Sequence, residues 1–135
     1  MKKITFFIFL LVISISCSSD NSDSQASNIP FIIGKWKVTQ RIIDGEEAEL
    51  SECTEITIHE FKSDFTMKSY IDTQVTGSVA CGIHEFLYKW EKISDSHFIS
   101  KHIGSNNILA NYYKENNKLK VVYSSENVAY YTRIL

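Results

Sequence analysis

From Ile29 to Leu135, apolar and polar side chains alternate with a period of two residues. This alternation is typical of β-strands, whose successive side chains point to opposite faces of a sheet. β-Branched and aromatic residues fill many of the apolar positions, and short polar turns such as Asp44-Gly45 separate the runs. The pattern predicts eight strands, over Ile33–Ile43, Thr54–Phe61, Phe65–Thr73, His84–Ile93, His97–Ile103, Ile108–Lys114, Lys118–Ser124 and Val128–Leu135.

Eight short strands joined by short connections favour an all-β antiparallel fold with one core. Sequential hairpins of this kind form either an up-and-down barrel or a flattened sandwich. A closed barrel has no exposed sheet edges, whereas an open eight-stranded sheet has to protect two of them. We therefore expect an up-and-down β-barrel over residues 30–135.

The first sixteen residues have a different pattern. Met1-Lys2-Lys3 is positively charged, and the run from Ile4 to Ile15 is apolar except for Thr5 and Ser14. Twelve residues are too few to span a bilayer as a helix, which takes about 20. The segment is typical of a signal peptide.

Cys17 stands where the apolar run gives way to polar residues. The stretch Ser14–Cys17 resembles a bacterial lipoprotein signal, although Ser14 replaces the commonest residue, Leu, at that position. The resemblance implies that residues 1–16 are removed and that Cys17 becomes lipidated and anchors the chain to a membrane. The alternative is an ordinary signal peptide with a cysteine nearby by chance.

Residues 17–29 are the lipidated cysteine and a polar segment that we interpret as a flexible tether. The residue after Cys17 is Ser18, and not the Asp that commonly retains lipoproteins in the inner membrane. This resemblance implies an outer-membrane lipoprotein of the cell envelope, either on the periplasmic face or on the cell surface.

Composition and charge limit the classes of binding partner that we expect. The chain has 16 acidic and 14 basic residues, and loss of Lys2 and Lys3 with the leader gives the mature protein a net charge of about −4. Basic residues form no patch or stripe along the sequence. Nucleic acid is therefore not an expected partner.

Two cysteines remain if Cys17 is lipidated. Cys53 and Cys81 then have one possible intramolecular pairing, and an oxidising envelope favours a disulfide between them. A redox-active or metal-binding thiol pair is the alternative, but the spacing is not Cys-x-x-Cys.

No arrangement of residues indicates catalysis, a metal site or a cofactor. The sequence has no Gly-x-Ser-x-Gly, no His-Glu-x-x-His and no phosphate-binding glycine loop. Five glutamates between Glu46 and Glu55 lack the order of a calcium loop, so we interpret them as a solvated rim. The four histidines are scattered, and we interpret them as solvated or incidental. We therefore expect a protein that is not an enzyme and that has no cofactor.

Four features in order resemble the small lipocalin-like domains found on bacterial lipoproteins, and together they cover nearly all of the mature chain. The first is Gly34-Lys35-Trp36, which is similar to the Gly-x-Trp of a lipocalin first strand. The others are Cys53-Thr54-Glu55-Ile56 through Phe61-Lys62-Ser63-Asp64, then Cys81 followed by Trp90 and Phe98, and finally Tyr131-Thr132-Arg133.

The resemblance implies a plug at one end of the barrel. Gly34 lets the chain enter closely, Trp36 fills the closed end, and Arg133 from the last strand covers Trp36. The sequence departs from the family at Phe65, where those domains usually have Gly. Because a bulky residue resists positive φ, we expect a different turn type there.

An aromatic set is the candidate ligand site. Phe86, Tyr88, Trp90, Tyr112 and Tyr130 are expected to line a pocket for one small apolar ligand that enters away from Trp36. The same side chains are also what a filled core needs, because an eight-stranded barrel is barely wide enough for its own side chains. A cavity smaller than roughly 300 Å³ would favour the filled core.

The alternative function is a ligand-free barrel that acts as a protein-interaction module of an envelope or cell-surface complex. Side chains expected to face outward would then form an exposed apolar patch. These are Leu87, Ile99, Leu109, Tyr113 and Tyr131.

Overall fold

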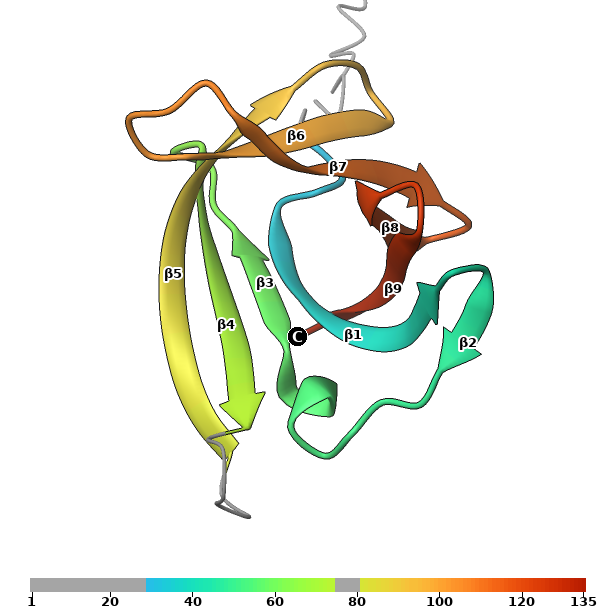
Figure 1. The fold of residues 1–135 in the computed structure, drawn as a ribbon. Coiled ribbons are helices and arrows are strands. Elements are labelled where there is room, and N and C mark those ends of the chain that lie inside the picture. Colours follow the sequence, from blue (N-terminus) through green and yellow to red (C-terminus); the bar gives the residue numbers. More distant parts are fainter. Residues whose placement is uncertain (1–28, 75–80) are drawn as a thin grey trace, which may run out of the picture.

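A computed structural model describes residues 29–74 and 81–135. In these ranges nine strands form one antiparallel sheet (Figure 1). The strands are β1 Gly34–Ile43, β2 Glu46–Ala48, β3 Ile58–Phe61, β4 Thr66–Gln74, β5 Cys81–Lys92, β6 His97–His102, β7 Ile108–Glu115, β8 Lys118–Ser124 and β9 Asn127–Ile134, and a short 3-10 helix, η1, spans Thr54–Ile56.

The leader (residues 1–16) and the tether with Cys17 lie outside the described residues. Their assignment therefore stays a prediction. Within the described ranges, no helix is both long and apolar enough to cross a membrane.

The sheet closes on itself. Strand order follows the chain, and β1 pairs with β9 from Lys35 opposite Ile134 to Ile43 opposite Asn127. Strands β1 and β3 to β9 thus form an eight-stranded up-and-down barrel, and β2 is an extra strand beside the end of β1. The prediction of an all-β antiparallel barrel is confirmed.

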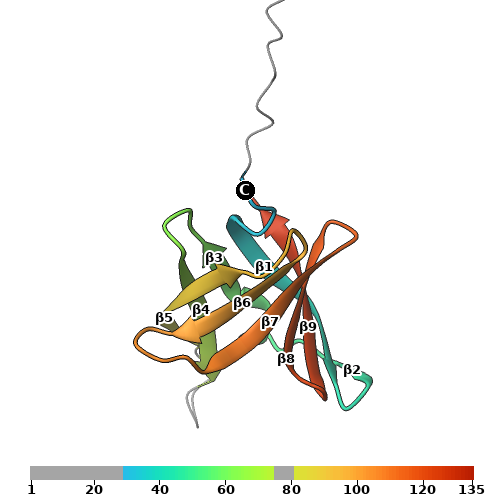
Figure 2. The same ribbon diagram turned by 90° about the horizontal axis from the view of Figure 1, so that it is seen from above.

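The barrel has two different ends. One carries the start of β1, the β3–β4 turn and the C-terminus, and we call it the closed end. Figure 2 shows the first described residues, in blue, beside the C-terminus at this end. The opposite end, where β1 and β4 finish and β5 begins, is the mouth.

Local structure differs from the expected pattern between Asp44 and Thr57. Asp44 and Gly45 both have positive φ, 54° and 83°, as a two-residue hairpin turn of type I′ requires. The turn brings β2 back along β1, so that part of the glutamate-rich stretch interpreted as a solvated rim forms a strand. The expected strand Thr54–Phe61 begins instead with η1, where the Ser51 hydroxyl accepts a hydrogen bond from the Thr54 N–H at 3.2 Å.

The expectation for Phe65 is wrong. Phe65 adopts φ of 63°, the left-handed conformation that the family's Gly would take. Contacts on both sides hold it there: the Asp64 carboxylate accepts hydrogen bonds from the N–H and hydroxyl of Thr66, and the Phe65 carbonyl accepts one from the Trp90 N–H at 2.9 Å. The Phe65 ring packs on Trp90 with 5.0 Å between ring centroids. These interactions offset a left-handed conformation that costs about 1–2 kcal/mol.

The core fills the closed half of the barrel. Large side chains from nearly every strand meet there, with Phe61 edge-on to both Tyr112 and Trp90. The buried members of this cluster are Ile32, Trp36, Val38, Phe61, Met67, Trp90, Phe98, Ala110, Tyr112, Leu119, Val121, Ala129 and Tyr131. Their alternation along each strand explains why the period of two was visible in the sequence.

Arg133 closes this end over Trp36. Its guanidinium carbon lies 4.5 Å from the centroid of the Trp36 ring, and its Nη1 and Nη2 groups donate hydrogen bonds to the carbonyls of Ile33 and Phe31, respectively. The Trp36 indole N–H in turn donates to the Ile32 carbonyl at 2.7 Å. The structure thus brings Gly34, Trp36 and Arg133 together, as the resemblance implied.

Gly34 is needed for this contact. Its φ is 130°, and a Cβ added to it would lie 2.6 Å from Nη1 of Arg133. A side chain at this position would therefore both strain the backbone and displace the guanidinium.

Candidate functional site

A β-bulge in β1 turns Arg41 into the barrel. Strict alternation from Trp36 and Val38 would place Arg41 on the outer face. The pairing with β9 shifts between Val38 and Gln40, so that Arg41 comes opposite Ala129. Directly paired residues share a face, and Ala129 is buried in the core, so Arg41 faces the interior.

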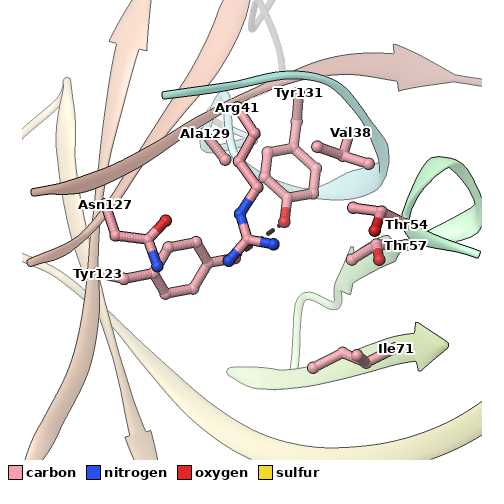
Figure 3. A pocket seen from close by; sticks show the side chains of 9 residues that line it. All are labelled: Val38, Arg41, Thr54, Thr57, Ile71, Tyr123, Asn127, Ala129 and Tyr131. Carbon is pink, nitrogen blue, oxygen red and sulfur yellow. Dashed lines mark hydrogen bonds between the residues drawn. The ribbon is translucent and has the colours of Figure 1, made fainter. Parts of the chain in front are cut away.

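Arg41 reaches a pocket at the mouth with a volume of about 240 Å³. Figure 3 shows its guanidinium among the side chains of Tyr123, Tyr131 and Asn127. The full lining is Val38, Arg41, Thr54, Thr57, Ile71, Tyr123, Asn127, Ala129 and Tyr131. Apolar carbon therefore forms much of the wall, and one cation stands among hydroxyl and amide groups.

The innermost polar groups form a triangle. The Tyr131 hydroxyl lies 2.7 Å from Nε2 of His59 and 2.8 Å from the Tyr123 hydroxyl, and the third side, Nε2 to the Tyr123 hydroxyl, is 3.1 Å. His59 is only 3% exposed, so the interpretation of this histidine as solvated is wrong. Its position is fixed by tyrosines from β8 and β9, far away in the sequence.

Burial keeps this triangle uncharged. It lowers the pKa of His59 to about 3, so the ring is neutral at pH 7. Burial also raises the pKa of Tyr131 and Tyr123, an effect that the nearby positive charge of Arg41 opposes. Arg41 is thus the one side chain of the lining that is charged at neutral pH.

A second, deeper space of about 180 Å³ adjoins the first. Both are lined by Ile71 and Tyr123, so these side chains stand between them. Oγ of Ser69 and Nδ1 of His59 are buried there without a hydrogen-bond partner among the described residues. Each space is smaller than the roughly 300 Å³ below which we expected a filled core, so the size of either space alone favours that alternative, and a ligand held here has to be a compact molecule.

A disulfide secures the edge of the mouth. Cys53 and Cys81 are bonded, as predicted. Cys53 immediately precedes η1 and the pocket residues Thr54 and Thr57, while Cys81 is the first residue of β5. The bond therefore attaches one wall of the pocket to a neighbouring strand.

The expected aromatic lining is only partly correct. Tyr88 and Tyr112 line the deeper space, and Trp90 is buried in the core beside Phe61. Phe86 is 43% exposed and stacks on Tyr88, with no part in either space. Tyr130 does not face the interior, because its neighbours Ala129 and Tyr131 do, and Lys120 lies over its ring.

The apolar patch expected for an interaction module is not present. Tyr131 and Ile99 are only 2% and 5% exposed, and Leu109 lines the deeper space. Tyr113 is half-buried and stacks on His97, which leaves Leu87 as the exposed member of the set. Tyr131 and Leu109 were assigned to the wrong face of their strands, because Tyr131 belongs to the core and Leu109 lines the deeper space.

The sequence interpretation missed Arg41, Thr54, Thr57, Ile71 and Asn127. Nothing in the local pattern marks the bulge that reorients Arg41. Thr54 and Thr57 enter the lining because η1 replaces the expected start of a strand. Within the described ranges, no group of three or more His, Cys, Asp and Glu side chains is placed to hold a metal ion.

Comparison with protein families identifies the barrel. A family model described as a lipocalin-like domain matches residues 32–134, which include all nine strands of the described ranges and the closed-end residues Gly34, Trp36 and Arg133. Searches of curated proteins and of solved structures gave no match. The resemblance first drawn from Gly34-Lys35-Trp36 and the later motifs is therefore confirmed for the barrel.

Proposed function

The chain belongs to the lipocalin-like domain family, and from this premise we propose that it is a lipid-anchored envelope protein that binds one small, mainly apolar ligand at the mouth of its barrel. The observation that carries the proposal is the pocket of about 240 Å³ whose wall includes Val38, Ile71 and Ala129. Apolar burial would supply most of the affinity, and the few polar groups would orient the ligand. We propose binding and not catalysis.

Filling the pocket tests the binding function. Ala129 is 1% exposed and lines the pocket, so Ala129→Leu should occupy part of the space a ligand needs. Ala48→Leu adds the same atoms to β2, outside the pocket. Native mass spectrometry of the full chain from its own cells should show a retained small molecule on wild type and on Ala48→Leu, and its loss from Ala129→Leu.

Thermal unfolding of both variants checks that the barrel remains folded. If folded Ala129→Leu retains the small molecule as wild type does, the molecule is not bound in this pocket. If folded wild-type protein retains no molecule, the proposal of ligand binding is contradicted.

The anchoring part of the proposal rests on the sequence before Ile29. We place the protein in the outer membrane, attached through acyl chains on Cys17. Each buried methylene of an acyl chain contributes about 0.8 kcal/mol, so two or more chains hold a protein stably. Cys17→Ser removes the acylated atom and should move the protein from the membrane fraction to the soluble fraction.

Ser18→Ala is the matched control, because it alters the next residue and leaves Cys17 in place. Fractionation followed by detection of the full chain measures both variants. Membrane association of Cys17→Ser equal to that of Ser18→Ala would exclude lipidation at Cys17 as the anchor.

A further inference from the structure

Arg41 stands in the pocket without a counter-charge. Among the described residues, it takes part in no ion pair, and no acidic side chain belongs to the pocket lining. The side chain is half-buried, and a cation taken partly out of water without a partner raises the free energy of the folded state. A negatively charged ligand group would offset this cost.

Several neighbouring hydroxyls can donate hydrogen bonds to the same ligand oxygens, whereas the buried Oδ1 of Asn127, which has no hydrogen-bond partner among the described residues, can only accept one. The Tyr123 and Tyr131 hydroxyls lie beside the guanidinium, and burial keeps both protonated at neutral pH by raising their pKa. They also contact each other and Nε2 of His59, so one O–H, that of Tyr123, is free for a ligand oxygen when Nε2 carries the histidine proton and donates to Tyr131. Thr54 and Thr57 add two more hydroxyls across the pocket (Figure 3). A carboxylate accepts several hydrogen bonds, and the planar fork of an Arg matches it with two parallel donors.

The surroundings favour a single negative charge. Exposed acidic side chains are close in the sequence to the pocket residues: Asp44 follows β1, Glu46 and Glu47 lie in β2, and Glu55 follows Thr54 in η1. These acids repel anions, and the repulsion grows with the charge of the ligand. One guanidinium can neutralise a monoanion, but it leaves a phosphate monoester with excess charge beside the rim.

We propose that the ligand is a compact amphipathic monocarboxylate, with its carboxylate on Arg41 and its apolar part against Val38, Ile71 and Ala129. This inference rests on the proposed binding function and adds the chemical class of the ligand. Arg41 determines specificity: it distinguishes a charged head group from a neutral one of the same shape.

Matched probes test the assignment. Octanoate and octanamide share one chain and differ in the charge of the head group, and titration calorimetry measures their affinity for the full chain in phospholipid nanodiscs. Wild type should bind octanoate about tenfold more tightly than octanamide. Arg41→Gln should bring the two affinities within about twofold of each other, mainly by weakening octanoate.

Lys35→Gln is the control. Lys35 is exposed on the same strand and lies outside the pocket. Lys35→Gln therefore changes the net charge by the same amount as Arg41→Gln without altering the pocket. It should keep the tenfold preference. Circular dichroism of each variant reports whether the barrel is intact.

The outcomes separate the two proposals. Equal binding of octanoate and octanamide to wild type, with no effect of Arg41→Gln, overturns the carboxylate assignment and leaves ligand binding in place. Tighter binding of octyl phosphate than of octanoate also overturns it, in favour of a phosphate head group. Absence of binding by all three probes overturns both the assignment and the binding of small amphipathic ligands.

Discussion

Gly34→Ala should lower the free energy of unfolding by about 3 kcal/mol. The new Cβ would lie 2.6 Å from Nη1 of Arg133, at a backbone φ of 130° that side chains rarely adopt. The variant therefore pays for a strained backbone and for a guanidinium displaced from Trp36 and from the carbonyls of Phe31 and Ile33. Chemical denaturation followed by tryptophan fluorescence measures the loss.

Gly104→Ala is the control for backbone strain alone. Gly104 has φ of 82°, and nothing lies within 4 Å of its added Cβ, so we expect a cost of about 1 kcal/mol. An Arg133→Met background isolates the steric part, because Gly34→Ala should cost less once the guanidinium is gone. Equal costs of Gly34→Ala in both backgrounds would show that the close approach of Arg133 contributes nothing.

Removal of the disulfide should cost a similar amount. Cys53 and Cys81 are 28 residues apart, and closing a loop of that length stabilises the folded state by about 3–4 kcal/mol on the chain-entropy model. The double variant Cys53→Ser with Cys81→Ser should therefore unfold at a clearly lower denaturant concentration than wild type. The enclosed segment contains η1, β3 and β4, so the pocket edge near Thr54 should loosen with it.

Reduction provides the comparison. Wild type treated with a thiol reductant should approach the stability of the double variant, whereas the double variant should not respond to reductant. A double variant as stable as oxidised wild type would mean that the barrel's other contacts already restrict this loop.

Strand positions were predictable because they depend on alternation, which is local, and barrel closure was predictable because an open sheet of eight strands would expose two edges. Phe98 and Leu119 are buried as their places in alternating runs require. The contact of Arg133 with Trp36 was predictable from the resemblance, since the last strand of a closed barrel lies beside the first.

Features set by distant partners were not predictable in this way. His59 reads as a polar residue between Ile58 and Glu60, yet tyrosines from β8 and β9 satisfy its Nε2 inside the barrel. The inward turn of Arg41 depends on one extra residue in the pairing of β1 with β9, and no turn residue marks it. The conformation of Phe65 could not be predicted either, because the cost of its left-handed backbone is offset by contacts with the distant residue Trp90.

The position of the chain's first described residue has a consequence for how a ligand would arrive. Ile29 lines a surface hollow together with Phe65 and Trp90 at the closed end, so any anchor that precedes it is attached at the end opposite the pocket. A nine-residue strand such as β4, tilted in the barrel wall, separates the two ends by roughly 20–25 Å. With the tether attached at the closed end, the mouth is left free of the attachment point and open to the aqueous compartment. A ligand can then enter from the water without passing the tether, which suits a molecule with a charged head group.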